Sequence, residues 1–255
     1  IIIIAANAGG AWSPIGDVTT IMLWIGGQVT AANIITKIFL PSVVCLLVPL
    51  IIVSFKIKGS IEKPLHEKKQ AFPIQKKEQL IIFFTGIAVL LFVPIFKTVT
   101  HLAPFMGILF GLSVVWILTE VLHKNKEVKH KKALSISGVL QKIDTPSILF
   151  FLGILIAVGC LQSAGHLTDM AQLLNTNLDN IYLVNTCIGV LSSIVDNVPL
   201  VAGAMGMYSL ETYPPDDTFW ELLTYCAGTG GSILIIGSAA GVAIMGILKL
   251  DFMWY

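Results

Sequence analysis

Two long apolar stretches of this chain are interrupted by the same pattern of glycines and small polar residues. Gly9-Gly10 is followed by four residues and then Ile15-Gly16-Asp17, and Gly230-Gly231 is followed by four residues and then Ile236-Gly237-Ser238. Backbone that leaves the helix within a bilayer is tolerated only inside protein or beside a water-filled cavity. Paired interruptions of this kind are typical of transporters built from two repeats. The pattern therefore predicts an all-α polytopic membrane protein with broken transmembrane helices.

The composition agrees with a membrane location. Of the 255 residues, 55% are hydrophobic and 12% are charged, whereas soluble domains have about 45–50% apolar and about 25% charged residues. The net charge of +1 says nothing about partners, because the charges collect in a few loops; as partner we expect the lipid bilayer and no nucleic acid. We also expect no cofactor, because the four cysteines stand singly, without the C-x-x-C spacing of a metal or redox site: Cys45, Cys160, Cys187 and Cys226.

Apolar segments of about 17–25 residues are needed to cross a bilayer. The clearest candidates are residues 36–55, 80–96, 102–122 and 147–161. Two spans separate the lysine-rich loops at residues 56–79 and 123–144, so both loops are expected on the same side of the membrane. By the positive-inside rule, both loops are predicted to be cytoplasmic.

A further apolar segment, residues 181–210, is interrupted at Ser192-Ser193 and at Asp196–Pro199. It either crosses the membrane once or enters and returns as a re-entrant hairpin bent near Asp196–Pro199. We favour the hairpin, because it makes the second broken helix antiparallel to the first, as in inverted repeats.

The repeat interpretation divides the chain into three parts. Residues 1–55 are the end of a first repeat, residues 56–145 are loops and two connecting spans, and residues 146–255 are most of a second repeat. By this interpretation the chain is truncated at both ends, with the first repeat's hairpin before residue 1 and a final span after residue 255.

Two aspartates fall at membrane depth in these interruptions, Asp17 and Asp196. An ionised Asp at the centre of a membrane helix costs roughly 3 kcal/mol on insertion scales, so such residues are functional by default. The alternative is that the two carboxylates only satisfy backbone groups in an unwound stretch. Because desolvation disfavours the charged carboxylate, a proton and a metal ion can compete for it. We therefore predict that both aspartates bind a small monovalent cation.

Oxygen-bearing side chains surround both aspartates, and hard cations prefer oxygen ligands. Any single Ser or Thr could instead bond to its own helix, so only the cluster is informative. The carbonyl groups freed at the end of a broken half-helix are further candidate ligands. No Lys or Arg lies near the breaks to hold an anion. With the two aspartates, the predicted ion-binding residues are Asn7, Thr19, Thr20, Ser192, Asn197, Thr229, Ser232 and Ser238, and the predicted helix-break residues are Gly9, Gly10, Pro14, Gly16, Gly230, Gly231 and Gly237.

Three segments carry a resemblance to a known family: residues 5–20, residues 193–199 and residues 228–232. They resemble NhaD-type sodium/proton antiporters of the ion transporter superfamily, over nearly the whole chain. The resemblance implies exchange of Na+ or Li+ for H+ across a bacterial inner membrane, with relatives in plastids, and a homodimer in the lipid bilayer. It places the family's polar residues on Asn7, Asp17, Thr19, Thr20, Ser192, Asp196, Asn197, Ser232 and Ser238.

Two other functions remain open at this point. The same fold could carry an anion, such as a dicarboxylate or arsenite. Alternatively, Asp17 and Asp196 could form the dyad of an intramembrane aspartyl protease, although Pro14 stands where the G-x-G-D motif of such enzymes has its first Gly. No motif for nucleotide-driven pumping or hydrolysis is present, so a secondary transporter rather than an enzyme is predicted.

Overall fold

The computed structural model describes residues 1–56, 76–124, 138, 140, 143, 145–178 and 180–249. Within these residues all regular secondary structure is helical, which confirms the prediction of an all-α protein. The chain divides into two compact units, Ile1–Lys58 with Ser147–Tyr255, and Gly59–Pro146. The two lysine-rich loops lie largely outside the described residues, so their cytoplasmic side stays a prediction.

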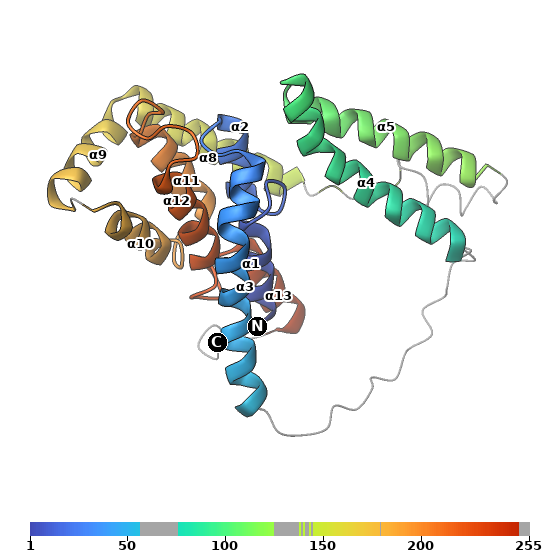
Figure 1. The fold of residues 1–255 in the computed structure, drawn as a ribbon, viewed down its shortest axis with the longest axis horizontal. Helices are drawn as coiled ribbons and strands as arrows, with labels where there is room; N and C mark the ends of the chain where they lie inside the picture. Colours follow the sequence, from blue (N-terminus) through green and yellow to red (C-terminus); the bar gives the residue numbers. More distant parts are fainter. Residues whose placement is uncertain are drawn as a thin grey trace. The chain divides into compact units, whose positions relative to one another are not determined.

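The smaller unit contains helices α4 (Lys76–Thr100) and α5 (Pro104–Leu122), which pack side by side (Figure 1). They are 25 and 19 residues long, apolar and long enough to cross a bilayer. Small residues bring them close together: a Cβ on Gly111 would lie 2.0 Å from Cγ1 of Val89. Both spans expected in this part of the chain are confirmed.

The larger unit holds α3 (Ala31–Lys56), a helix of 26 residues, and α8 (Thr145–Ser163). After a bend of 78°, α8 is followed by α9 (His166–Asn177). Within the described residues, α3, α4 and α5 are long and apolar enough to cross a membrane, and α8 with α9 is a fourth candidate if the bent pair is one span. The protein is therefore a multi-pass membrane protein.

The first broken helix consists of α1 (Ile2–Ala11) and α2 (Val18–Gly26). Between them the helical hydrogen bonding stops at residues 12–17. Asp17 accepts a hydrogen bond from the backbone N–H of Val18 and so forms the N-cap of α2. The new helix begins here because a short carboxylate side chain satisfies an N–H group that has no partner in the first turn.

The predicted hairpin is formed by α10 (Ile181–Leu191) and α11 (Asn197–Met207). Ile181, at the start of α10, and Tyr208, just after α11, line one cavity of about 270 Å³. The segment therefore doubles back on itself, as the hairpin interpretation expects, and its path relative to the membrane stays a prediction.

The bend of the hairpin lies at residues 192–196, slightly before the predicted Asp196–Pro199. The side chain of Asp196 accepts a hydrogen bond from Val198 N and forms the N-cap of α11. Pro199 then falls in the first helical turn, where the missing N–H would have no partner in the helix. The proline therefore belongs to the second arm rather than to the bend.

The second broken helix consists of α12 (Thr218–Gly230) and α13 (Ala239–Leu248), with residues 231–238 between them. α12 contacts both arms of the hairpin, both halves of the first broken helix and α3. Its residues Phe219, Trp220, Leu223 and Ala227 are almost completely buried. The core of this unit is thus built around α12, and the two breaks and the hairpin tip meet beside it.

Candidate functional site

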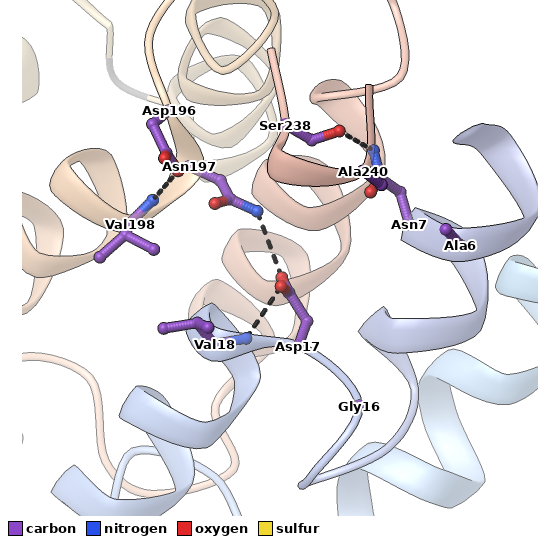
Figure 2. Close-up of a pocket in the computed structure, with 10 residues that line it drawn as sticks. All are labelled: Ala6, Asn7, Gly16, Asp17, Val18, Asp196, Asn197, Val198, Ser238 and Ala240. Carbon is purple, nitrogen blue, oxygen red and sulfur yellow. Dashed lines mark hydrogen bonds between the residues drawn. The ribbon is translucent and has the colours of Figure 1, made fainter. Parts of the chain in front are cut away.

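A cavity of about 190 Å³ opens where the first break, the hairpin tip and the second break meet (Figure 2). Side chains from all three segments face it. It is lined by Ala6, Asn7, Gly16, Asp17, Val18, Asp196, Asn197, Val198, Ser238 and Ala240.

Asp17 is the most extensively hydrogen-bonded side chain at this cavity. Its Oδ1 accepts a hydrogen bond from Val18 N at 2.8 Å, and its Oδ2 accepts one from Asn197 Nδ2 at 3.2 Å. The hydroxyl of Thr19 also donates to Oδ2. Figure 2 shows Asn197 reaching from the hairpin tip toward Asp17. A single carboxylate therefore joins the first break to the hairpin.

Asp196 faces the same cavity from the hairpin tip. Its Oδ1 accepts a hydrogen bond from Val198 N at 3.2 Å. Asp17 and Asp196 thus both cap helix N-termini, where the partial positive charge of the helix stabilises a carboxylate. None of the residues that line the cavity is a Lys or an Arg, so the site combines two acidic groups without a basic partner.

The second break contributes neutral oxygen atoms. Ser238 is the N-cap of α13, with its Oγ accepting from Gly241 N at 3.2 Å. Asn7 Nδ2 donates to Ser238 Oγ at 3.1 Å and to Ser232 Oγ at 3.0 Å. The amide of Asn7 therefore connects α1 to the second break, although these segments lie at opposite ends of the sequence.

Five of the predicted ion-binding side chains line the cavity: Asn7, Asp17, Asp196, Asn197 and Ser238. Thr19 and Ser232 each bond to one of these five and stand behind them. The remaining three donate to backbone carbonyls instead. They are Thr20, to Ala11 O at 3.4 Å, Ser192, to Ala227 O at 2.8 Å, and Thr229, to Tyr225 O at 2.6 Å.

The carbonyl groups at the end of α1, which we expected as candidate ligands, accept hydrogen bonds within the protein. Gly10 O accepts from Ser13 N at 3.3 Å, and Ala11 O accepts from Thr20. The polar side chains that line the cavity come from α1 (Asn7), from the starts of α2 and α13 (Asp17 and Ser238) and from the hairpin tip (Asp196 and Asn197).

Most of the predicted helix-break glycines allow close backbone approach. A Cβ on Gly16 would lie 2.6 Å from Gly10 O, one on Gly237 would lie 2.6 Å from Ser193 O, and one on Gly230 would lie 2.1 Å from Gly189 O. Among the described residues, the glycines with positive φ are Gly27 and Gly165, outside both breaks. The breaks need glycine for lack of space and not for left-handed backbone.

Other predicted break residues differ from this pattern. A Cβ on Gly9 would have nothing within 4 Å, and Pro14 is buried in the turn between the half-helices. Sequence reasoning also missed four residues of the cavity wall: Ala6, Val18, Val198 and Ala240. An apolar residue within an apolar run carries no signal that would single it out.

Comparison with known proteins shows similarity over the whole chain. The chain is 50% identical to sodium/proton antiporter 1 and 47% identical to sodium/proton antiporter 2, both of Arabidopsis thaliana, over its full length. It is 32% identical over 96% of its length to the Na(+)/H(+) antiporter NhaD of Vibrio cholerae. The predicted resemblance to NhaD-type antiporters is confirmed.

The chain spans 44%, 61% and 54% of the length of these three relatives, in the same order. No solved structure matches it significantly. A family model described as a citrate transporter, CitMHS, matches residues 1–228. The chain therefore belongs to the CitMHS citrate transporter family.

Proposed function

We propose that the protein exchanges Na+ or Li+ for H+ across a membrane, with Asp17 and Asp196 as the groups for which cation and proton compete. The observation that carries the proposal is the cavity at which both carboxylates meet the amides of Asn7 and Asn197 and the hydroxyl of Ser238. Carboxylate, amide and hydroxyl oxygens are the ligands that hard cations prefer. The relatives named as sodium/proton antiporters support the same activity.

Exchange follows from competition at these carboxylates. Removing a carboxylate from water disfavours its charged form, and either a proton or a small cation restores neutrality. A site that takes up the cation releases its proton, and protonation releases the cation. If the empty, charged site rarely turns from one side of the membrane to the other, the movement of the cation is coupled to the movement of the proton. Transport rather than catalysis, with no cofactor, is therefore the role we assign to the acidic pair.

Proton movement in everted membrane vesicles that contain the full-length protein tests this proposal. Asp17→Asn should abolish sodium-dependent proton release, because the amide cannot exchange a proton. Asp169→Asn is the matched control, since Asp169 is exposed on α9 and outside the cavity. It should leave exchange unchanged. Sodium-dependent proton release that survives Asp17→Asn, at normal protein level, would contradict the proposal.

A second candidate function is anion transport, which the description of the CitMHS family favours. Against it, the cavity presents two carboxylates and no Lys or Arg, and like charges at close range repel in a low dielectric. Uptake of labelled citrate, dicarboxylate or arsenite by the same vesicles, without a sodium effect on pH, would favour this second function over exchange.

We further propose that the protein works as a homodimer in the bilayer and that its two breaks belong to inverted repeats. The matching spacing of the two breaks supports the repeats. The family resemblance supports the homodimer and, as a location, the bacterial inner membrane. The Arabidopsis relatives place similar sequences in a plant as well, so the organism of origin decides which membrane applies.

A further inference from the structure

The two breaks have matching local geometry. In the first, a Cβ on Gly10 would lie 3.1 Å from Cβ of Asp17. In the second, a Cβ on Gly231 would lie 3.0 Å from Cβ of Ser238. Each of these glycines stands seven residues before its partner. Asp17 and Ser238 therefore hold equivalent positions, one charged and one neutral.

A second pair of equivalent positions lies further upstream, because Asn7 stands ten residues before Asp17 and Gly228 stands ten residues before Ser238. Asn7 donates to Ser238 Oγ at 3.1 Å. A Cβ on Gly228 would lie 3.8 Å from Oδ2 of Asp17. When two equivalent segments are related by a two-fold axis, each contact occurs twice. If position i of the first segment contacts position j of the second, then position i of the second segment contacts position j of the first. The two contacts have this reciprocal form.

The two reciprocal contacts differ in the side chain at the upstream position. Beside Ser238 the position is occupied by the amide of Asn7, whereas beside Asp17 the position is Gly228, which has no side chain. Gly228 is buried on α12. A Cβ there would also lie 3.3 Å from Cβ of Ala11, which is fully buried at the end of α1. The position beside Asp17 that corresponds to Asn7 thus carries no side chain, and a Cβ there would be in van der Waals contact with Oδ2 of Asp17.

We propose that Gly228 is a positioning residue that sets the space around Oδ2 of Asp17 and thereby the size of cation that the site accepts. This inference rests on the proposed exchange of Na+ or Li+ for H+. Oδ2 already accepts hydrogen bonds from Thr19 and Asn197, so little room is left for a cation and its other ligands. A methyl group on residue 228 reduces that room further, and Na+ is larger than Li+.

Gly228→Ala in the full-length protein tests the inference. The half-saturating concentrations of Na+ and of Li+ for proton release from everted vesicles should be compared with those of the wild type. We expect the Na+ value to rise relative to the Li+ value by on the order of tenfold, as for a difference of about 1.4 kcal/mol between the two ions. Gly203→Ala on α11 is the matched control, because its Cβ would meet only Cε of Met207, at 3.9 Å. It should leave the ratio unchanged.

A double variant separates positioning from general distortion. Ala11→Gly removes the Cβ against which the new methyl group would press, so Ala11→Gly with Gly228→Ala should restore thermal stability lost in Gly228→Ala. The shifted Na+ to Li+ ratio should persist, because the methyl group still stands beside Oδ2 of Asp17. A ratio that returns to the wild-type value together with stability would overturn the inference.

The outcomes of the inference and of the proposed function can be told apart. Wild-type exchange with an unchanged ratio in Gly228→Ala overturns the role of Gly228 and leaves the exchange function standing. Absence of sodium- and lithium-dependent proton release from the wild-type protein overturns both.

Discussion

The carboxylate of Asp17 caps α2 and faces the cavity at the same time. Its Oδ1 accepts the hydrogen bond from Val18 N, and its Oδ2 accepts those from Thr19 and Asn197. Asparagine caps a helix about as well as aspartate does. Replacing Asp17 by Asn therefore removes the charge while keeping the cap, whereas Ala would remove both. Because an amide NH2 at the Oδ2 position no longer accepts from Thr19 and Asn197, protein level in the membrane is measured beside exchange in Asp17→Asn.

Asn7 is another residue whose side chain joins distant parts of the chain. Asn7→Ala removes its hydrogen bonds to Ser232 and Ser238. Each such bond contributes about 0.5–1.5 kcal/mol, so we expect the free energy of unfolding to fall by about 1–3 kcal/mol. Thermal unfolding of the purified full-length protein measures this. Ser54→Ala, at an exposed position bonded only within its own helix, should change stability little; equal losses in the two variants would argue against the link.

At the scale of the elements, the hairpin is held against the second broken helix by backbone contacts. A Cβ on Gly189 of α10 would lie 2.9 Å from Cys226 O of α12. Ser192, at the hairpin bend, donates to Ala227 O at 2.8 Å. Close approach of helix backbones through small residues is a main source of packing energy in membranes. The hairpin and α12 therefore form a closely packed pair.

Gly230→Ala tests this packing. Its Cβ would lie 2.1 Å from Gly189 O, which is backbone and cannot turn aside as a side chain would. Overpacking of this kind costs about 1–3 kcal/mol, and we expect the thermal unfolding midpoint to fall accordingly. Gly159→Ala on α8 has nothing within 4 Å of its Cβ and should be neutral or slightly stabilising. Equal midpoints for wild type and Gly230→Ala would show that the hairpin does not need this contact.

At the scale of the whole molecule, the first break, the hairpin and the second break bring two carboxylates to one cavity. Two acidic groups without a basic neighbour cannot both remain charged and empty in a low dielectric without a large cost. Under the proposed exchange, occupancy by protons or by cations is therefore a property of the assembled site and not of either aspartate alone.

The proposed competition between cation and proton predicts how the proposed transport depends on pH. As pH falls, more of the carboxyl groups carry a proton, so the half-saturating Na+ concentration should rise, on the order of tenfold per pH unit for one proton competing with one cation. The measurement is Na+-dependent proton release from everted vesicles at a series of pH values. A half-saturating Na+ concentration that does not change with pH would mean that cation and proton bind at separate groups.

The larger features could be predicted from the sequence because each depends on a local pattern. Long apolar runs predict spans, and α3, α4 and α5 have the required length. Glycines beside small polar residues predict the breaks, and an isolated acidic residue in an apolar stretch predicts Asp17 and Asp196 as site residues. These inferences need only the cost of burying polar groups in a bilayer.

Which polar side chains meet at the cavity could not be read from the sequence, because contact between distant segments depends on packing. Thr229 and Ser192 look the same in sequence as Ser238, yet they donate to backbone carbonyls while Ser238 faces the cavity. The sequence by itself determined a multi-pass helical protein with two broken helices, an interrupted segment between them, and two acidic residues, one in the first break and one in that segment. Only the tertiary structure decided that Asp17 lies beside Asn197 and Gly228, because helices separated along the chain fix that distance by how closely their backbones pack.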